Sequence, residues 1–421
     1  LTKGIMREYF RAYSLISRNA KLFLLGGIFN GIGMSVFRLL FNLYLKEGGM
    51  GEGNIGTILS ARSLGAALIA FPVALLLRKV HAKYILIAAT FMASIFYALQ
   101  VHTGKLFLIV TFAFFAHMFF MIYRLVSAPF FMQNSTPRER IYLFSLHSAV
   151  FVVSQFAGNI IGGNLPHLFL KLSLAGSLLK AYEITLYASI AATMASLLPY
   201  LGIKEKPIVR NGQTLFSEMK NYNWERIIRL VIPRFLVGMG AGLIIPFMNL
   251  YFRNDFGLGS DTIGLYFSIL QVFMFIGMMS APFLARRFGM VNGIVLTQLL
   301  SLPFMLIMAL TDKLPLAVGA FFIRTTLMNM NQPLNRNFAM EIMRKEEQPM
   351  THSITMIAWN LSWMVSAFIG GRIIEAHSFK YSFFVTIVLY ILSTTAYYIL
   401  FRSFSSVGRP AREQKPLSEN L

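Results

Sequence analysis

The sequence predicts an all-α membrane protein with twelve transmembrane helices in two pseudo-symmetric six-helix bundles. The chain of 421 residues is 56% hydrophobic and only 13% charged, whereas soluble domains carry about 25% charged residues. Gly, Pro and charged residues divide it into twelve apolar segments, each near the length of about 20 residues that spans a bilayer. The sequence also repeats itself, because NLYL at 42–45 recurs as NLYF at 249–252, and IGG at 161–163 recurs at 369–371.

The apolar segments, taken in order, define the domain organisation. The predicted spans are 21–45, 55–77, 84–102, 106–130, 141–163, 179–201, 227–252, 262–285, 290–311, 314–338, 352–374 and 380–402. The longest polar break forms a linker, 202–226, between an N-terminal bundle, 21–201, and a C-terminal bundle, 227–402. Residues 1–20 mix basic and apolar side chains, as amphipathic segments on a membrane surface do. Residues 403–421 have the Ser, Pro and charge content of a disordered tail.

Basic residues gather on one side of the predicted spans. With the N-terminus inside the cell, the inner segments together with the adjoining span ends hold 24 Lys and Arg, and the outer loops with theirs hold eight. Because Lys and Arg are enriched in cytoplasmic loops, we expect both termini and the linker of a plasma-membrane protein to face the cytoplasm. Basic loops facing an anionic leaflet also account for the net charge of +21 without a nucleic acid partner.

Two like halves with several apolar spans each are typical of secondary transporters that work by alternating access. No Gly-x-x-x-x-Gly-Lys-Ser/Thr motif occurs, so ATP hydrolysis within this chain is not expected to drive transport. The absence of Cys excludes disulfides and thiolate metal sites. We therefore expect no enzyme activity, no cofactor and no metal. We expect the protein to be a monomer whose partners are membrane lipids and a small-molecule solute.

Twelve spans in two halves, with a basic pair in two matching loops, resemble the major facilitator superfamily from about residue 20 to residue 402. The pairs are Arg78-Lys79 and Arg286-Arg287, which are offset by 208 residues. The family's loop motif, Gly-x-x-x-Asp-Arg-x-Gly-Arg-Arg, helps to latch the inner gate. Both copies in this chain carry Arg where the family places Asp. The resemblance therefore implies a basic gating loop that lacks the acidic latch.

A degenerate motif in the fifth span bears on the direction of transport. Gly158, Asn159, Gly162 and Gly163 stand where antiporters of the family, many of them drug exporters, carry Gly-Pro-x-x-Gly-Gly. The resemblance favours efflux without fixing the direction of transport. Small residues also let helices approach closely in any bundle, so packing alone is a second explanation that the sequence leaves open.

Charged and polar side chains inside the spans are the candidate site residues, because a charge at the bilayer centre costs at least about 2.5–3.5 kcal/mol. In the family, helices 1, 4, 7 and 10 line a central cavity. Helical spacing places polar residues of the first, fourth and tenth spans on single faces. The predicted substrate-binding residues are Arg38, Asn42, Arg62, His117, Arg124, Arg324, Asn331, Asn335 and Trp359. Arg234 and Arg336, near the cytoplasmic ends, are expected instead to reach lipid phosphates.

The charges within the spans indicate the class of solute. Apart from the basic residues at span ends that are counted with the loops, six Arg lie there, and no acidic residue lies at mid-depth. Buried guanidinium groups stay protonated and bind carboxylate or phosphate through two hydrogen bonds, which favours an anionic or zwitterionic organic solute, amphipathic ones included. A broad-specificity drug exporter with a Met- and Phe-rich lining is an alternative. A non-transporting membrane protein, such as a lipid scramblase or a receptor, is another.

Overall fold

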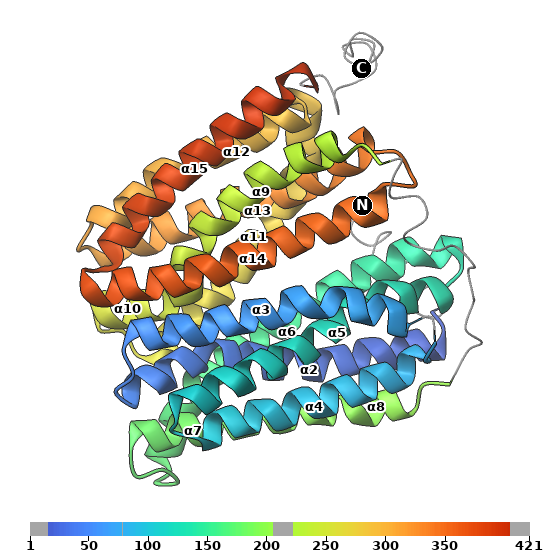
Figure 1. Ribbon diagram of the computed structural model, residues 1–421. Coiled ribbons are helices and arrows are strands. Elements are labelled where there is room, and N and C mark those ends of the chain that lie inside the picture. The colour runs from blue at the N-terminus through green and yellow to red at the C-terminus, as the bar shows by residue number, and fades with distance from the viewer. Residues whose placement is uncertain (1–15, 78, 205–221, 405–421) are drawn as a thin grey trace, which may run out of the picture. The chain divides into compact units, whose positions relative to one another are not determined.

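The computed structural model describes residues 16–77, 79–204 and 222–404, and within these ranges all regular secondary structure is helical (Figure 1). The first half of the chain contains α2 (Arg18–Glu47), α3 (Glu52–Leu76), α4 (Ala82–His102), α5 (Leu106–Gln133), α6 (Pro137–Lys171), α7 (Leu178–Ala195) and α8 (Leu197–Leu201). The second half contains α9 (Trp224–Ile244), η2 (Ile245–Phe247), α10 (Met248–Phe256), α11 (Ser260–Phe288), α12 (Met290–Leu310), α13 (Leu314–Ile342), α14 (Gln348–Ala376), α15 (Phe379–Phe401) and η3 (Arg402–Phe404).

The predicted fold class is confirmed, with two spans that are not continuous helices. Within the described residues, ten helical segments are long and apolar enough to cross a membrane by length and composition. The predicted span 179–201 is divided into α7 and α8, and the span 227–252 is divided into α9, η2 and α10. Pro199 and Pro246 follow these breaks closely. Proline has no backbone N–H and its ring clashes with the preceding turn, which explains why both helices are interrupted there.

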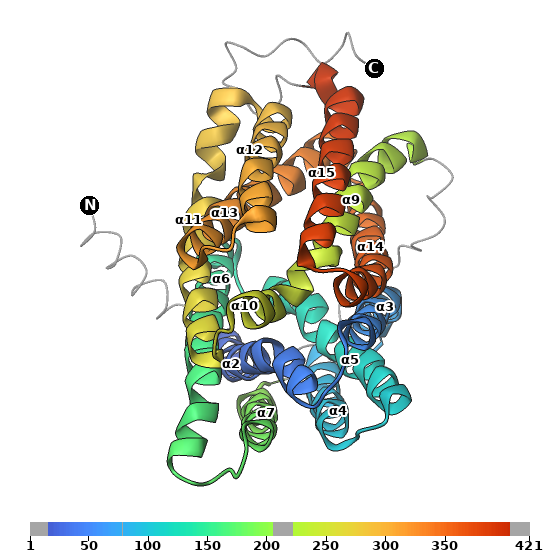
Figure 2. The same ribbon diagram turned by 90° about the vertical axis from the view of Figure 1, so that its left-hand side faces the viewer.

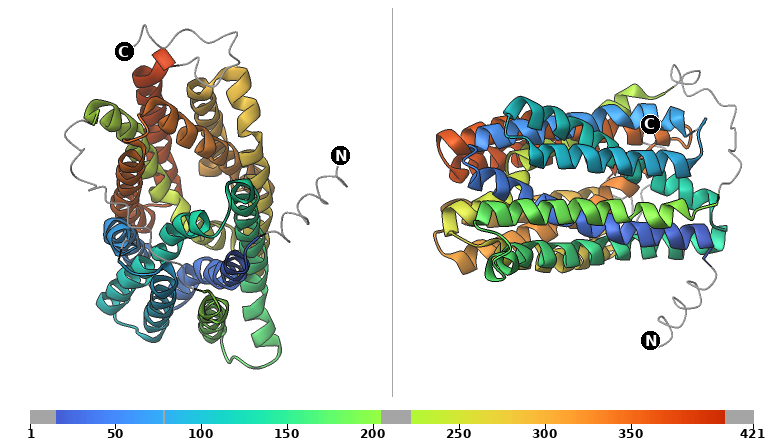
Figure 3. Two further views of the ribbon diagram at one scale, coloured as in Figure 1. Left: turned by 90° about the vertical axis from the view of Figure 1, so that its right-hand side faces the viewer. Right: turned by 90° about the horizontal axis from the view of Figure 1, so that it is seen from below.

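The described chain divides into two compact units, and each takes segments from both halves of the sequence. The first unit combines residues 16–50, 64–204 and 259–268, and the second combines 51–63, 222–258 and 269–404. Helix α3 therefore begins in the second unit and continues in the first, and α11 does the converse. Figure 2 and Figure 3 show the same helices from further sides.

The internal repeat of the sequence returns as repeated contacts inside the units. The hydroxyl of Tyr44 donates to the carbonyl of Val101 over 3.1 Å in the first unit. The hydroxyl of Tyr251 donates to the carbonyl of Met308 over 2.9 Å in the second. Both members of the second pair are offset by 207 residues from those of the first. The two halves thus share packing as well as sequence pattern.

Small residues bring α2 close to α6 in the first unit and α9 close to α14 in the second. Each close contact joins a Gly on one helix to a Ser on the other, so that the two backbones nearly touch. The pairs are Gly31 with Ser154, Gly158 with Ser35, Gly238 with Ser362, and Gly242 with Ser366. Gly158 in the first half corresponds to Ser366 in the second, and Ser35 corresponds to Gly242. The repeat therefore preserves the close approach of the helices rather than the residue at each position.

A buried carboxylate holds the start of α9 to the loop between α13 and α14. Glu347 is 2% exposed, and its Oε1 accepts hydrogen bonds from the backbone N–H of Asn223 over 2.8 Å and from the Arg344 guanidinium over 2.7 Å. The backbone N–H of Arg344 donates to Oε2 over 3.2 Å. Burial acts to raise the pKa of the Glu347 carboxyl, but these hydrogen bonds outweigh it and hold the pKa below its ordinary value.

We expect Gly370→Ala to lower the thermal stability of the protein in detergent. A methyl group at Gly370 of α14 would lie 2.6 Å from the carbonyl oxygen and 2.8 Å from the Cα of Leu243 in α9, and overpacking of this kind costs about 1–3 kcal/mol. The matched control is Gly319→Ala in α13, where a Cβ meets nothing within 4 Å and helix propensity improves by about 1 kcal/mol. Equal melting temperatures for the two variants would contradict this prediction and show that α9 and α14 can move apart at little cost in stability.

Glu347→Gln should destabilise the protein at neutral pH and lose its effect in acid. Because the folded-state pKa of Glu347 is lowered, its charged form stabilises the fold above the ordinary value of 4.5, and this stabilisation disappears as the pH falls through the lowered pKa. Melting temperatures of wild type and Glu347→Gln across this range should therefore converge on acidification. Glu346→Gln, at the exposed neighbouring position, is the control. A difference that persists unchanged at the lowest pH would contradict the role of the charge.

Candidate functional site

Arg324 of α13 is a buried cation whose partner is a neutral side chain. The residue is 5% exposed, and its Nη2 donates a hydrogen bond to the hydroxyl oxygen of Tyr390 in α15 over 2.7 Å. The guanidinium carbon lies 5.6 Å from the centre of the Tyr390 ring. The buried Nε of Arg324 has no hydrogen-bond partner in the described chain.

The position of Tyr390 is fixed by a close crossing of α15 with α9, which pack side by side (Figure 1). A Cβ at Gly240 of α9 would lie 2.7 Å from Cε1 of Tyr390, so the ring rests directly on the glycine. One turn earlier in α15, the hydroxyl of Thr386 donates to the carbonyl of Gly240 over 3.0 Å. The tyrosine hydroxyl is therefore held where it meets Arg324.

No carboxylate pairs with Arg324 among the residues that the structure describes. Its recorded partner is Tyr390, while the ion pairs of the described acids lie elsewhere. Burial of a charge is costly unless an opposite charge or several hydrogen bonds compensate it. One hydrogen bond and one aromatic ring compensate only part of this cost, so the guanidinium retains the capacity to bind an anion.

A stripe of amides continues along α13 after Arg324. The Nδ2 of Asn329 donates to the carbonyl of Thr325 over 2.8 Å, and the Nε2 of Gln332 donates to the Oδ1 of Asn329 over 2.7 Å. The Nδ2 of Asn335 donates to the carbonyl of Asn331 over 3.1 Å. These local bonds satisfy polar groups within the helix itself. The buried Nδ2 of Asn331 has no partner in the described chain, so one amide donor of the stripe is left over.

The structure distributes the predicted site residues over both units. Arg38, Asn42, His117 and Arg124 belong to the first unit, and Arg62, Arg324, Asn331, Asn335 and Trp359 belong to the second. Asn331 and Asn335 are in contact, whereas Arg324 is seven residues before Asn331, about 10 Å along the helix. Their contacts with a solute stay predictions.

In the first unit the predicted residues meet neighbouring helices. Arg38 donates a hydrogen bond to the Oε1 of Gln155 in α6. The Nδ1 of His117 lies 3.5 Å from the hydroxyl of Tyr97 in α4. Asn42 is buried, Arg62 of the second unit is buried as well, and Arg124 is exposed.

Trp359 of α14 lies beneath a cation from α9. The guanidinium carbon of Arg234 is 4.3 Å from the centre of the Trp359 ring, and Trp363 follows one turn later with its ring centre 5.7 Å from that of Trp359. The expectation that Arg234 reaches lipid phosphates did not anticipate this ring contact. Tyr390 was also missed, because a single tyrosine in an apolar span carries no periodic signal. A glycine facing it, Gly240, is a signal visible only in three dimensions.

The fifth-span motif lies in helix contacts of the first unit. The hydroxyl of Ser35 donates to the Oδ1 of Asn159 over 2.7 Å. A Cβ at Gly162 would lie 3.1 Å from the Cα of Val36, and one at Gly163 would lie 2.6 Å from the carbonyl oxygen of Ser260. With the contact of Gly158 to Ser35, all four motif residues pack against another helix.

Of the predicted gating loops, Lys79, Arg286 and Arg287 are exposed, and Arg78 lies outside the described residues. The guanidinium carbon of Arg287 is 5.6 Å from the ring centre of Phe288. No acidic partner is recorded for these three side chains in the described ranges. The contribution of the loops to gating stays a prediction.

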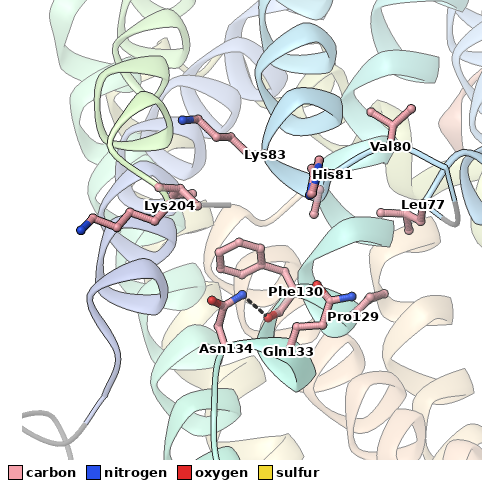
Figure 4. Close-up of a pocket in the computed structure, with 11 residues that line it drawn as sticks. Leu77, Val80, His81, Lys83, Pro129, Phe130, Gln133, Asn134 and Lys204 are labelled. Atoms are coloured by element: carbon pink, nitrogen blue, oxygen red, sulfur yellow. Dashed lines mark hydrogen bonds between the residues drawn. The ribbon is translucent and has the colours of Figure 1, made fainter. Parts of the chain in front are cut away.

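A small pocket near the α3–α4 loop of the first unit is lined in part by His81, Lys83, Phe130, Asn134 and Lys204 (Figure 4). Its buried amide is used by the fold. The Nδ2 of Asn134 donates to the carbonyl of Phe130 over 2.9 Å, and its Oδ1 accepts from Asn19. The Oδ1 of Asn19 accepts in turn from the backbone N–H of Lys204. We attribute this pocket to the packing that holds the end of α8, not to a solute site.

Comparison with known proteins identifies the kind of chain to which this architecture belongs. The family model of the Major Facilitator Superfamily matches residues 23–365 and 230–420. No curated protein matches the chain. A bacterial homologue of the human lysosomal transporter Spinster, in an inward-facing and unoccupied conformation, is similar with a TM-score of 0.75 and 13% identity, over 91% of this chain and 96% of that one.

Two further solved structures show the same fold. The nucleoside transporter NupG is similar with a TM-score of 0.70 and 14% identity, over 91% of this chain and 98% of that one. A bacterial homologue of the iron transporter ferroportin, in an inward-facing state, has a TM-score of 0.69 and 13% identity, over 91% and 98% of the two chains. At such identities the likeness shows the fold alone.

Proposed function

We propose that this chain, which belongs to the major facilitator superfamily and is a membrane transporter, carries an anionic or zwitterionic organic solute by alternating access. Arg324 is the residue that we expect to bind the anionic group of the solute. The observation that carries the proposal is a buried guanidinium whose recorded partner is the neutral Tyr390 hydroxyl. Transporters of the same fold carry solutes of different chemistry, so the solute class is argued from the side chains.

The chemistry of Arg324 favours a carboxylate or a phosphate. A guanidinium stays protonated in proteins, and its planar fork donates two parallel hydrogen bonds to such groups. The Nε of Arg324 is unpartnered, and Tyr390 takes one hydrogen bond of Nη2. Donors are therefore left for a ligand. The amides of Asn331 and Asn335 add neutral hydrogen-bonding capacity along the same helix, which suits the polar part of a zwitterion.

Three described acids of the second unit are engaged near helix ends. The Oε1 of Glu52 accepts from the amide of Asn254 over 2.8 Å, and the Oε2 of Glu375 accepts from the backbone N–H of Gly53 over 3.0 Å. Glu347 binds Arg344 in the α13–α14 loop. An exporter of lipophilic cations needs a carboxylate in its binding region, and no described acid of the second unit shares the depth of Arg324 in its helix.

We further propose that the transporter lies in the plasma membrane with both termini in the cytoplasm and exchanges one anion for another. The excess of Lys and Arg in the inner segments supports this orientation. Exchange is favoured because the unoccupied site leaves the Arg324 charge poorly compensated, so conformational change with an anion bound costs less than change without one. Small residues in the fifth-span motif support helix packing whichever way the solute moves.

Arg324→Ala should abolish transport of an anionic solute while the protein still folds and inserts. Loss of a hydrogen bond to a charged group costs about 1.5–3 kcal/mol, which corresponds to a roughly 10- to 150-fold loss of affinity. Arg324→Lys should restore little, because an ammonium group cannot reproduce the planar fork. Uptake into proteoliposomes by wild type and both variants measures this. Arg372→Ala in α14, which removes an Arg that lies over the Phe368 ring, is the charge-matched control.

Unchanged anion affinity in Arg324→Ala would overturn the proposal. Improved uptake of lipophilic cations by the same variant would instead favour a drug exporter, because removal of a buried positive charge eases their binding. Tyr390→Phe separates charge from position: it keeps the cation and the ring but removes the hydroxyl that accepts from Nη2. We expect this variant to keep selectivity for anions and to lose part of its affinity.

A further inference from the structure

A second group of cations lies in the second unit, on α9, α13 and α14. Arg234, on α9, has its guanidinium carbon 4.3 Å from the centre of the Trp359 ring. A Cβ at Gly238, one turn further along α9, would lie 3.2 Å from Cε3 of Trp359, so the glycine brings this indole close to α9. The packing of the two helices therefore fixes Trp359 beneath the cation.

Two more basic groups join Arg234. Arg336 of α13 lies close enough to repel Arg234 electrostatically, and both guanidinium groups act in the same way on His352 of α14. His352 and Trp359 are seven residues apart, two turns along one face of α14. Three helices thus contribute two fixed positive charges and one imidazole to one place. We define Arg234, Arg336, His352 and Trp359 as the inner basic cluster.

No acidic side chain balances the inner basic cluster in the described part of the chain. The charged neighbours that act on Arg234 and His352 are the guanidinium groups of the cluster itself. The ion pairs of the described residues lie elsewhere. Arg336 and His352 are exposed and Arg234 is half-buried, so a ligand has access to them. Like charges held together without a counter-charge are stabilised when an anion binds.

We propose that the inner basic cluster is a second anion site, which binds the phosphate group of a phosphomonoester carried on an aromatic or apolar body. Two guanidinium groups match the charge of about −1.5 to −2 that a phosphomonoester carries at neutral pH. Trp359 and Trp363, with ring centres 5.7 Å apart, supply an aromatic wall for the organic body. The buried Nε1 of Trp363 has no partner in the described chain and adds one donor.

The proposal rests on the proposed function and narrows its solute class. Arg324 and Arg336 lie on the same helix, twelve residues apart, which is about 18 Å along the axis. Asn329, Asn331 and Asn335 stand between them. The inner basic cluster lies toward the end that we expect to face the cytoplasm. A phosphomonoester therefore binds there either before or after it binds at Arg324. The two sites are too far apart for one phosphate to contact both.

Tryptophan fluorescence offers a direct measurement, because two of the three Trp of the chain, Trp359 and Trp363, lie at the site. The full-length Trp224→Phe protein in detergent is titrated with phenyl phosphate, benzoate and benzyl alcohol. Phenyl phosphate should change the fluorescence and bind at least about 10-fold more tightly than benzoate, because its charge is nearly twice as large. Benzyl alcohol should bind weakest. Equal affinity for all three would overturn the proposal.

Variants assign the binding to the inner basic cluster. Arg234→Gln and Arg336→Gln, made in the Trp224→Phe protein, should each weaken phenyl phosphate by about 10-fold or more. His352→Gln should weaken it less. The control is Arg229→Gln on α9, which removes the same charge from an exposed residue paired with Glu225. Because Arg336 is exposed, its substitution leaves the fold intact. Unchanged affinity in Arg336→Gln would overturn the proposal even if Arg234→Gln failed to fold.

Arg324→Ala distinguishes failure of this proposal from failure of the proposed function. It should leave the fluorescence titration unchanged while it abolishes transport. If the inner variants bind phenyl phosphate like wild type and Arg324→Ala still abolishes transport of anions, the inner site is wrong and the proposed function stands. If Arg324→Ala transports normally while the inner variants lose binding, the proposed function is wrong and the inner site stands as a phosphate site.

Nanodiscs identify the source of the phosphate. The titration is repeated in phosphatidylcholine and in phosphatidylglycerol nanodiscs, since basic groups near a membrane surface also attract anionic lipids. Binding of phenyl phosphate with similar affinity in both assigns the site to a soluble phosphomonoester, as proposed. Loss of binding in phosphatidylglycerol alone would assign the same phosphate chemistry to a lipid headgroup and overturn the assignment to a solute.

Discussion

Close approach of helices at small residues is the constraint on which the rest of this structure depends. In lipid the hydrophobic effect does not drive helices together, so their association relies on packing and on hydrogen bonds between them. Gly238 and Gly242 of α9 receive Ser362 and Ser366 of α14. The same helix presents Gly240 to Tyr390 of α15. One helix with three alternate glycines therefore sets the positions of both neighbours, and through them the positions of Trp359 and Arg324.

A polar site held in this way is rigid before any ligand arrives. The Tyr390 ring cannot move toward α9 because backbone lies there, and its hydroxyl is thus fixed relative to Arg324. On α13, amides that bind carbonyls one turn back are likewise restrained. Side chains that are already fixed lose less conformational entropy when a ligand binds.

The sequence predicts the architecture well because the architecture repeats. Tyr44 and Tyr251 stand at matching places of the two halves, and their hydroxyls make matching contacts. The individual partners of site residues are less predictable. Tyr390 contacts Arg324, which is 66 residues away in the sequence. Arg234 of α9 contacts Trp359 of α14. Such pairs depend on how helices cross, which follows from the volumes of several residues together. Helical periodicity shows which face of a helix is polar and which is apolar, but it does not show which neighbouring helix covers each face.

The distribution of charge along α13 has a consequence for how an anion moves. A single strong site would hold an anion tightly and release it slowly, because affinity differences appear mainly in the dissociation rate. Arg324 and Arg336, about 18 Å apart on one helix, instead offer two regions of positive potential joined by neutral amides. An anion leaving one region moves toward another cation, so its energy changes less steeply along the helix than it would with one isolated charge. Two anion sites of moderate affinity, separated by hydrogen-bonding amides, thus permit both binding and release. A transporter requires both, whereas a protein that only stores its ligand does not.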